Sequence, residues 1–598
     1  MRSAWLSLFL LLILTGCAPA PKPADQPDKK AAEALHQLFA DEWSTRMRDD
    51  PLFATASDVH DYDDKLPSVT PADFTRRLQQ DQDYRKRLSA ISRDALSHED
   101  QVNYDLFEFV LKHRLALAPF KQWRIPLTSD EGFHIEVMRM AAGVRMSSVQ
   151  DYENYIARLH AVPAYFDQQI ANLRQGMADG FTLPAVIMPG VIKVVEGQQY
   201  TAPEKTPFWE PFTRFPDTIS AADRERLMTA ARSAIQGDTI PAFNKLLTFF
   251  SKEYLAAARR TIGASDLPDG KAYYEASVRF YTNLDVTPDQ VHELGLSEVA
   301  RIHAEMDAVI KQTGFKGDFA AFLKFLRTDP RFYAKTPDEL LKDASYIAKQ
   351  IDGLLPGYFG KLPRQPYSVQ PVPAELAPNY TAGRYSPAPL GGLKGGEYWV
   401  NTYALEKRPL YALTALTLHE AVPGHHLQGA LARELENVPP FRLDLYPHAF
   451  GEGWGLYSEK LGKEMGMYKT PYDEFGRLTY EMWRACRLVV DTGMHWKGWT
   501  REQALEYLAS NTALSLHEVE TETNRYIAWP GQALAYKMGE LKILELRKRA
   551  HDALGDRFDI RAFHDAVLEN GGVPLPILET QIDEYIAAAQ RNAARTRQ

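Results

Sequence analysis

The chain has 598 residues, of which 45% are hydrophobic and 25% are charged, a composition that fits a folded globular protein and excludes a disordered or collagen-like chain. Its 69 basic and 78 acidic residues give a formal net charge of −9, and no long basic run occurs. The charge pattern therefore argues against a nucleic-acid partner. The length allows several domains or one large helical unit.

The first residues have the features of an export signal. An apolar run over residues 4–14 follows a basic residue and is too short to span a bilayer comfortably. Leu-Thr-Gly-Cys at residues 14–17 matches the bacterial lipobox, whose cysteine is lipidated and becomes the mature N-terminus. We therefore predict a signal peptide over residues 1–17, lipidation of Cys17 and a proline-rich tether over residues 18–32. The alternative is an ordinary cleaved signal with a chance cysteine.

Residues 33–364 show the periodicity of helices. Apolar residues over 100–111 recur at a spacing near 3.6, and Thr287 with Pro288 and Gln290 has the pattern of a capped helix start. No regular alternation of strands and helices stands out. We expect an N-terminal helical lobe here, without a catalytic constellation.

The most informative stretch contains His419, Glu420, Pro423, Gly424 and His425. In an H-E-x-x-H helix, two histidines four residues apart bind one Zn²⁺, and the glutamate acts as general base on the metal-bound water. Here Pro423 occupies the fourth position, and His425 follows His419 by six positions, roughly 240° around a straight helix. Because Pro423 clashes with the preceding turn and Gly424 tolerates unusual dihedral angles, we expect a bulge of two residues. The bulge would place His425 beside His419 and leave Glu420 as the base.

The segment H-E-A-V-P-G-H-H-L-Q at residues 419–428 resembles the signature of a bacterial family known as domain of unknown function 885. That family resembles the gluzincin metallopeptidases, and members are described as metallocarboxypeptidases. The Gly-His-x-Leu part is also similar to the second half of the H-E-x-G-H-x-L helix of oligopeptidases and thermostable carboxypeptidases. This alignment makes His425 the second ligand and leaves His426 behind the ligands, although His426 stays open as the alternative.

The resemblance implies a mainly helical, gluzincin-like fold, similar to oligopeptidases and thermostable carboxypeptidases, with a deep cleft and one Zn²⁺ per chain. We place the zinc-containing catalytic lobe at residues 365–598 and its metal helices at 409–540. Six prolines break any helix over residues 365–401, where two segments have the pattern of strands around a glycine-rich turn. We therefore expect a small hairpin or sheet beside the zinc helix.

One strand of this region is a candidate for substrate binding. In gluzincins, the edge of a strand beside the zinc helix binds the substrate backbone by strand addition. We assign this role to residues 398–401, which include Tyr398 and Asn401. The alternative is a small hairpin that faces solvent.

A second acidic motif, Gly-Glu-Gly-Trp-Gly-Leu-Tyr-Ser-Glu at residues 451–459, supplies the expected third ligand. Three protein ligands leave one zinc position for water, and Glu452 resembles the third-ligand site of zinc aminopeptidases. Glu459 lies on the same helix face, about 10 Å further along, and is expected to orient a ligand histidine. The alternative is that both are solvated helix carboxylates.

A polar stripe follows on the next helix, because Arg484, Arg487, Asp491 and His495 recur at spacings of three, four and four residues. Charges on a buried helix must be paired, and such a network is a candidate functional site or an internal ion-pair ladder. We expect Arg484 and Arg487 to bind substrate, Asp491 to support the ligands, and His495 to stabilise the oxyanion or bond a ligand carboxylate.

The last motif, at residues 523–539, contains a second set of candidates. Related peptidases place a tyrosine hydroxyl opposite the zinc, and Tyr536 is our first choice, with Tyr526 the second. Arg525 and Lys537, together with Gln532, are candidates for binding a terminal carboxylate, which arginine can do bidentately. The alternative for the basic pair is simple surface charge.

These assignments predict a lipid-anchored zinc metallopeptidase in which Glu420 assists attack of zinc-bound water on a peptide bond. A carboxypeptidase is favoured, because the predicted cleft offers basic side chains for a terminal carboxylate while its own carboxylates have other roles. The alternatives are an oligoendopeptidase or dipeptidase of the same chemistry, and an inactive peptide-binding or metal-binding lipoprotein.

The expected partners are a peptide substrate and a membrane, which the protein reaches through the lipid on Cys17. Ala18, and not an aspartate, follows Cys17, and the bacterial sorting rule that the resemblance implies then favours the outer membrane, with the protein facing the periplasm. The sequence leaves the oligomeric state open.

Overall fold

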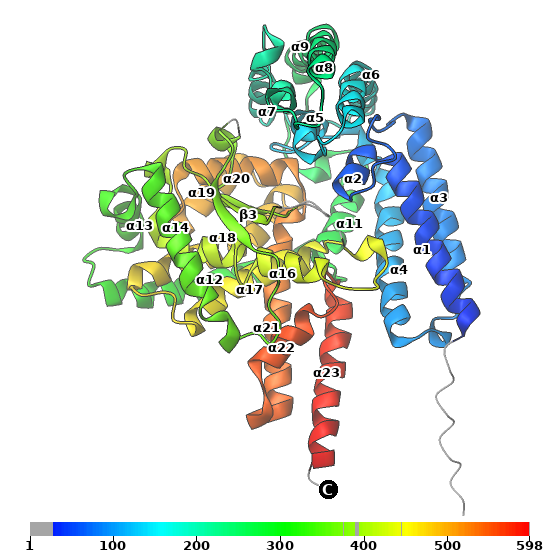
Figure 1. Ribbon diagram of the computed structural model, residues 1–598. Helices are drawn as coiled ribbons and strands as arrows, with labels where there is room; N and C mark the ends of the chain where they lie inside the picture. Colours follow the sequence, from blue (N-terminus) through cyan, green and yellow to red (C-terminus); the bar gives the residue numbers. More distant parts are fainter. Residues whose placement is uncertain (1–27, 375, 389–393, 444, 597–598) are drawn as a thin grey trace, which may run out of the picture.

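A computed structural model describes residues 28–374, 376–388, 394–443 and 445–596 (Figure 1). Helices account for 71% of the structure and strands for 4%, which confirms the predicted mainly helical fold with a small sheet. Cys17, the predicted signal peptide and most of the predicted tether lie outside the described residues. The first helix begins at Lys29, so the last residues of the predicted tether are helical. Among the described residues, no helix is both long enough and apolar enough to cross a bilayer.

The first part of the chain forms two groups of helices (Figure 1). Serine and threonine side chains cap several of them, as at Thr70, Ser97 and Ser148, where the hydroxyl accepts a hydrogen bond from the backbone N–H three residues later. The helices are α1 (Lys29–Asp49), α2 (Pro51–Ala56), α3 (Pro71–Ser89) and α4 (His98–Leu117) in one group, then α5 (Phe133–Arg139), α6 (Val149–Asp179), α7 (Met188–Glu196), α8 (Ala221–Ala234), α9 (Ile240–Phe249) and α10 (Leu255–Ala257) in the other, followed by α11 (Gly270–Thr282).

The next helices join the second half of the chain. They are α12 (Pro288–Thr313), α13 (Phe319–Thr328) and α14 (Pro337–Asp352). Thr287 and Gln290 form the predicted capping box at the start of α12. α12 packs closely along α18 (Pro471–His495), since a Cβ on Gly295 would lie 2.7 Å from the Cβ of Leu488. One hydrophobic core therefore continues across residue 364, the predicted boundary between the lobes.

The sheet has three strands, β1 (Tyr367–Pro371), β2 (Gly383–Ser386) and β3 (Gly396–Val400), in the order β1-β3-β2. β3 pairs in parallel with β1 and antiparallel with β2, so it is the central strand. The prediction of a substrate-binding edge at Tyr398 and Asn401 is therefore wrong. Tyr398 is fully buried, and the Asn401 side-chain amide donates to three backbone carbonyls of residues 377–381. The free edge near the cleft belongs to β2.

The remaining helices include α15, α16 and α17, which carry the predicted metal ligands. They are α15 (Leu413–Glu420), α16 (His425–Arg433), α17 (His448–Glu464), α18, α19 (Arg501–Asn511), α20 (Leu516–Ala528), α21 (Ala535–Leu554), α22 (Ile560–Leu568) and α23 (Leu575–Thr596). α17 and α21 cross at Gly453 and Gly539, where a Cβ on Gly453 would lie 2.4 Å from the Gly539 carbonyl carbon. Only glycine permits this approach, which brings the start of α21 against α17.

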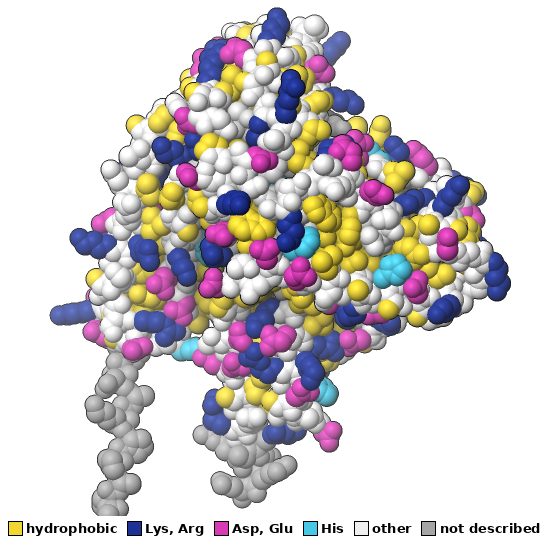
Figure 2. All heavy atoms as spheres, turned by 180° about the vertical axis from the view of Figure 1, so that it is seen from behind, with side chains coloured by type: hydrophobic (Ala, Val, Ile, Leu, Met, Phe, Trp, Pro, Cys, Tyr) yellow, Lys and Arg dark blue, Asp and Glu magenta, His cyan; other side chains and the backbone are white. Residues whose placement is uncertain are grey.

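The surface carries both signs of charge. Figure 2 shows the face opposite to that of Figure 1, and acidic and basic side chains are interspersed over its described residues. This distribution agrees with the modest net charge of −9. No extended basic area covers the described residues of that face.

Candidate metal centre

The H-E segment and its following histidines lie on two helices, because the predicted bulge is a complete break. α15 ends at Glu420, and α16 begins at His425. The intervening turn contains a cis bond before Pro423, and the Trp454 indole donates to the Pro423 carbonyl at 2.8 Å. A Cβ on Gly424 would lie 1.9 Å from the His419 carbonyl oxygen, so glycine is required there.

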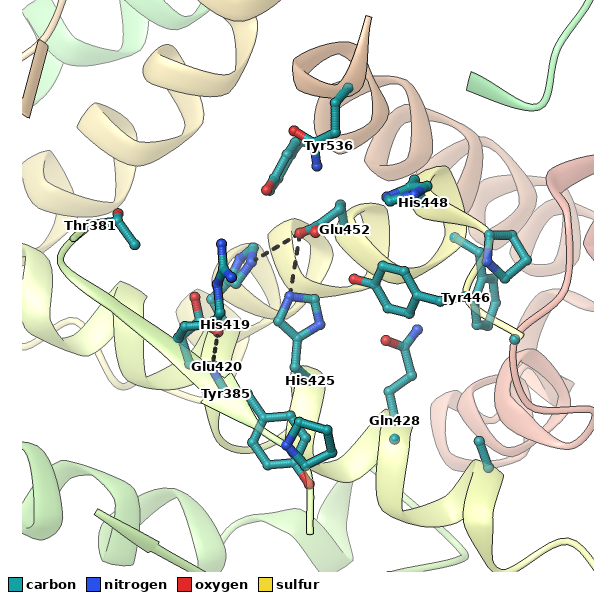
Figure 3. Close-up of a pocket in the computed structure, with 18 of the residues that line it drawn as sticks. Thr381, Tyr385, His419, Glu420, His425, Gln428, Tyr446, His448, Glu452 and Tyr536 are labelled. Atoms are coloured by element: carbon teal, nitrogen blue, oxygen red, sulfur yellow. Dashed lines mark hydrogen bonds and ion pairs between the residues drawn. The ribbon is translucent and has the colours of Figure 1, made fainter. Parts of the chain in front are cut away.

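The break brings two histidine rings together, with His419 and His425 centroids 4.7 Å apart and perpendicular. Glu452 of α17 completes the group, with its Oε2 atom 3.7 Å from His419 Nε2 and 3.3 Å from His425 Nε2 (Figure 3). Potential ligand atoms of the three residues lie within 4.8 Å of one another. Gly455 makes room for this arrangement, since a Cβ there would lie 2.7–2.9 Å from the His419 ring.

The donor set fits a zinc ion. Two imidazole nitrogens and one carboxylate oxygen are the ligands of many three-ligand zinc sites, which keep a position for water. Burial opposes protonation of His419, but the hydrogen bonds that its ring donates to the Glu452 and Glu459 carboxylates outweigh it and raise its pKa to about 10. The two histidines in turn hold the pKa of Glu452 well below its usual range, against the effect of burial. The site therefore favours a positive charge at this point, whether a proton or a metal ion.

Two further glutamates contact the group. Glu459 Oε1 is 2.8 Å from His419 Nδ1, which fixes the imidazole with Nε2 toward Glu452, and Arg484 lies 3.3 Å from the same carboxylate oxygen. Glu420 lines the cleft, and its Oε2 atom accepts a hydrogen bond from the backbone N–H of Tyr385 at 2.8 Å. Tyr385 belongs to β2, so the sheet edge positions Glu420.

His426 lies outside the group. Its ring nitrogens are 3.2 Å from the Tyr385 hydroxyl and 3.1 Å from the Gln365 carbonyl, and only 2% of the residue is exposed. Burial lowers the pKa of His426 to about 4. The structure therefore pairs His419 with His425, and His426 points from α16 toward Tyr385 of β2 and the Gln365 carbonyl without bonding a ligand residue.

A cleft of about 430 Å³ opens in front of these residues. One wall contains five predicted residues from α18, α20, the turn before α21 and α21 itself, namely Arg484, Arg487, Arg525, Gln532 and Tyr536. The Arg525 guanidinium donates to Gln532 at 3.0 Å and to the Tyr536 hydroxyl at 3.3 Å. Within the described part of the chain, three buried nitrogens of this wall have no hydrogen-bond partner: Arg484 Nε, Arg487 Nη1 and Arg525 Nε. The wall therefore places three guanidinium groups beside the cleft.

The structure corrects the predictions for His495 and Asp491, which lie fully buried away from the cleft. His495 Nδ1 accepts from the Ala264 N–H at 2.9 Å, and Nε2 is 2.9 Å from the Tyr526 carbonyl. Asp491 accepts from the Tyr274 hydroxyl at 2.6 Å and from the Gly531 N–H at 3.1 Å. Both side chains satisfy backbone and side-chain groups of neighbouring elements, so neither stabilises an oxyanion or a ligand.

Lys537 and Tyr526 are corrected in the same way. Lys537 is fully buried, and its ammonium pairs with Glu298 at 3.1 Å, Glu481 at 2.9 Å and Glu540 at 2.6 Å. The Tyr526 hydroxyl accepts from the Trp483 indole at 2.7 Å and from Arg487 Nε at 2.8 Å. Neither residue lines the cleft. Both instead bond residues of α18 in the interior, Lys537 through Glu481 and Tyr526 through Trp483 and Arg487.

Several cleft residues escaped the sequence analysis, among them Glu131, Arg384, Tyr446 and His448. Arg384 of β2 is 3.3 Å from Glu131, which belongs to a loop before α5. Tyr446 lies beside Glu452. Its ring packs on Gly451, because a Cβ at that position would lie 2.3 Å from a ring carbon of Tyr446. The Gly-Glu pair at residues 451–452 was a possible signal for this aromatic contact, whereas nothing local indicated Glu131.

The cleft continues into two neighbouring cavities. One, of about 980 Å³, shares Glu131, Arg384 and Arg433 with the cleft. The other, of about 480 Å³, shares Tyr446 and His448 with it. In Figure 3, Tyr385 and Tyr446 lie on opposite sides of His425. The candidate metal centre therefore lies within a longer hollow.

A mainly helical chain that brings two histidines and a glutamate together beside a cleft defines a candidate metalloprotein. Its sequence matches the family model described as "Bacterial protein of unknown function (DUF885)" over residues 51–582, so the chain belongs to that family, as the resemblance of the H-E segment predicted.

Two solved structures are similar to the chain. "The crystal structure of the putative lipoprotein from Colwellia psychrerythraea" matches with a TM-score of 0.87 and 29% identity, over 93% of this chain and 100% of that one. The structure of "a putative lipoprotein of unknown function from Shewanella oneidensis" shares the fold, with a TM-score of 0.69 and 19% identity over 91% and 98% of the two chains. No curated protein matches the chain.

Proposed function

We propose that this protein is a gluzincin-like zinc metallopeptidase of the bacterial cell envelope, and that it acts as a carboxypeptidase. The single observation that supports the proposal most is the meeting of His419, His425 and Glu452, with Glu420 beside them at the cleft. A buried carboxylate next to a two-histidine, one-glutamate group is the arrangement that metal-assisted hydrolysis requires.

His419, His425 and Glu452 would hold the zinc, and Glu459 would keep the His419 imidazole in the orientation that directs Nε2 toward the ion. Bound zinc would supply a Lewis acid that lowers the pKa of a coordinated water to about 7. Glu420 keeps Oε1 available, since Tyr385 occupies Oε2. We assign Glu420 Oε1 to take a proton from the attacking water and to return it to the leaving amine.

The carboxypeptidase assignment rests on the arginines of the cleft. Arg487 Nη1 and Arg525 Nε are buried donors without a partner among the described residues, and both side chains line the cleft. A substrate carboxylate bound by arginine gains charge-assisted hydrogen bonds, each worth about 1.5–3 kcal/mol. Tyr536 is hydrogen-bonded to Arg525 and stacks at 6.3 Å from the His419 ring, so its hydroxyl is the proposed oxyanion donor.

The anchor and location follow the same proposal. The lipobox at Cys17 and the similarity to two structures described as lipoproteins support attachment to a membrane. We place the protein at the outer membrane, facing the periplasm, where peptides are available as substrates.

An oligoendopeptidase is the second candidate, because the cleft continues into cavities on two sides. One peptide in three forms distinguishes the candidates: free, amino-acetylated and carboxy-amidated. A carboxypeptidase releases single residues from the C-terminus of the first two and cuts the amide far more slowly. Internal cuts in all three would establish the endopeptidase, cleavage blocked only by acetylation would indicate recognition of the amino terminus, and no cleavage by zinc-loaded protein would reject the peptidase.

A further inference from the structure

The cavity of about 480 Å³ beside the cleft has walls from the first helical group. It meets the cleft at residues 445–448, which lead into α17. Its remaining wall comes from α3, α4, α11 and the turns between Ala118 and Trp123, with Phe74, Phe109, Val110, Leu117, Trp123 and Phe280 as its apolar members. The volume lies in the range of ligand pockets, which runs from roughly 300 to 1,000 Å³.

Aromatic side chains dominate this wall. The Phe74 and Trp123 rings stack with centroids 5.1 Å apart, and the His113 ring lies 4.2 Å from Phe109 and 5.4 Å from Phe280. All five side chains are half-buried, so each keeps part of its surface open. An apolar hollow of this kind indicates an apolar ligand group.

Charged groups contribute little to the cavity. No carboxylate is among its described lining residues. The Arg114 guanidinium is paired with Glu42 at 2.9 Å and Asp81 at 3.2 Å, and burial lowers the pKa of His113 to about 4, which leaves its ring neutral at pH 7. Lys121, the other cation of the described lining, is exposed. The cavity on the other side of the cleft differs, because Glu131, Arg139 and other charged residues line it.

The cavity lies next to the candidate metal centre, where the substrate bond would be cleaved. Tyr446 and His448 line both the cavity and the cleft, and the Tyr446 ring lies 6.3 Å from the ring of His425. Figure 3 places both side chains next to Glu452. A substrate side chain that passes them would therefore belong to a residue close to the cleaved bond.

We propose that this cavity is a specificity subsite that takes one large apolar or aromatic side chain of the peptide, next to the bond that is cleaved. The proposal rests on the proposed peptidase function. It identifies the substrates as peptides with leucine, phenylalanine or tryptophan beside that bond, and it gives the first helical group a part in substrate selection.

Val110→Phe tests the subsite, because it adds a ring to the cavity wall on α4. Glu108→Phe is the matched control, since it adds the same ring at an exposed position of α4 outside the cavity. The full-length protein is given peptides that differ only in the residues beside the cleaved bond. The wild type should prefer phenylalanine over alanine by at least about tenfold in kcat/KM, since even one methylene in an apolar pocket gives about 10- to 200-fold discrimination.

Val110→Phe should reduce that ratio at least about tenfold, and Glu108→Phe should leave it unchanged. An unchanged ratio in a folded Val110→Phe protein, or a wild type that prefers alanine or charged residues, would overturn the proposal.

A binding measurement distinguishes failure of the subsite proposal from failure of the proposed peptidase function. Titration of Glu420→Gln protein with the same peptides should show tighter binding of the phenylalanine peptide, lost on adding Val110→Phe, even if no form of the protein cleaves peptides. Equal binding of the phenylalanine and alanine peptides would also reject the subsite.

Discussion

At the scale of single residues, the metal site depends on three side chains from three helices. The full-length protein should hold about one Zn²⁺ per chain. His419→Ala, His425→Ala and Glu452→Ala should each lose most of it, because each removes one of three ligand atoms that lie within 4.8 Å of one another. Metal content is measured by inductively coupled plasma mass spectrometry.

His426→Ala is the control for this prediction, because the His426 ring bonds Tyr385 and the Gln365 carbonyl and not a ligand residue. It should retain most of the zinc. An empty site in His426→Ala together with a full site in His425→Ala would reverse the assignment of the second ligand.

Glu420 differs from the three ligands because its carboxylate faces the cleft and is bound by the Tyr385 N–H. Glu420→Gln keeps the side-chain shape but cannot take up a proton. The variant should retain its zinc and its fold, while peptide turnover falls by at least about a hundredfold, the scale expected for loss of a general base. Near-native turnover in a zinc-loaded Glu420→Gln protein would remove Glu420 from the mechanism.

At the scale of elements, glycine positions decide how closely the metal helices approach. A Cβ on Gly455 would lie 2.7–2.9 Å from the His419 ring, so Gly455→Ala must displace that ring or α17. The variant should lose about 1–3 kcal/mol of stability and most of its zinc affinity. The measurements are urea unfolding and zinc titration. Gly190→Ala in α7 is the control, since a Cβ at this position would meet no described atom within 4 Å, and it should be neutral or slightly stabilising.

Asp491 links α18 to α11 and to the turn before α21. Because its carboxyl group is buried, its contribution to the free energy of unfolding should depend on pH. Burial raises the pKa of Asp491 to about 7, above the ordinary value of about 3.9 that holds in the unfolded chain. Between these two pKa values the folded state keeps a proton that the unfolded state has lost. The stabilisation that protonated Asp491 gives the folded state is therefore full below about pH 4 and is lost as the pH rises through 7.

Asp491→Asn cannot titrate, so the comparison isolates this effect. The unfolding free energy of the wild type minus that of Asp491→Asn should fall by up to about 4 kcal/mol between pH 4 and pH 8. Urea unfolding of both proteins at several pH values measures it. A difference that is constant over this range would show that Asp491 is ionised throughout.

The same elements show what the sequence could and could not predict. The pairing of His419 with His425 was predictable, because proline and glycine at positions 423 and 424 allow only a few local geometries. Glu452 followed from its resemblance to a known ligand setting. Glu131 was not predictable, since its place at the cleft depends on how a loop distant in sequence folds against β2. His495 was misassigned because helical spacing gives the face of a side chain but not the element that packs against it.

At the scale of the whole molecule, buried charges join the two halves of the chain. Lys537 of α21 pairs with Glu298 of α12, Glu481 of α18 and Glu540 of its own helix, and Arg301 of α12 lies within 2.5 Å of the Glu481 carboxylate. These contacts cross the predicted boundary at residue 364. The packing of α12 on α18 places a helix from the predicted N-terminal lobe behind the wall of the cleft, so the metal helices and the first half of the chain should unfold together.

Lys537→Met tests whether the buried charges hold the two halves of the chain together during unfolding. Removing the ammonium leaves three buried carboxylates with too little positive charge, so the free energy of unfolding should fall by about 3–5 kcal/mol. Zinc content at low denaturant should stay at about one per chain, because Lys537 does not line the cleft.

Adding Glu540→Gln to Lys537→Met should recover part of the stability. Within the described residues the Glu540 carboxylate is bonded to Lys537 through Oε2 and has no hydrogen-bond partner at Oε1. Without Lys537 the negative charge of Glu540 is buried and unpaired, so replacing it with a neutral amide should raise the free energy of unfolding. Urea unfolding followed by circular dichroism, with zinc release recorded in the same titration, measures both effects. Zinc release well before the loss of helix would show that the two halves unfold independently, and a Lys537→Met protein as stable as the wild type would show that the buried network contributes nothing to holding α12, α18 and α21 together.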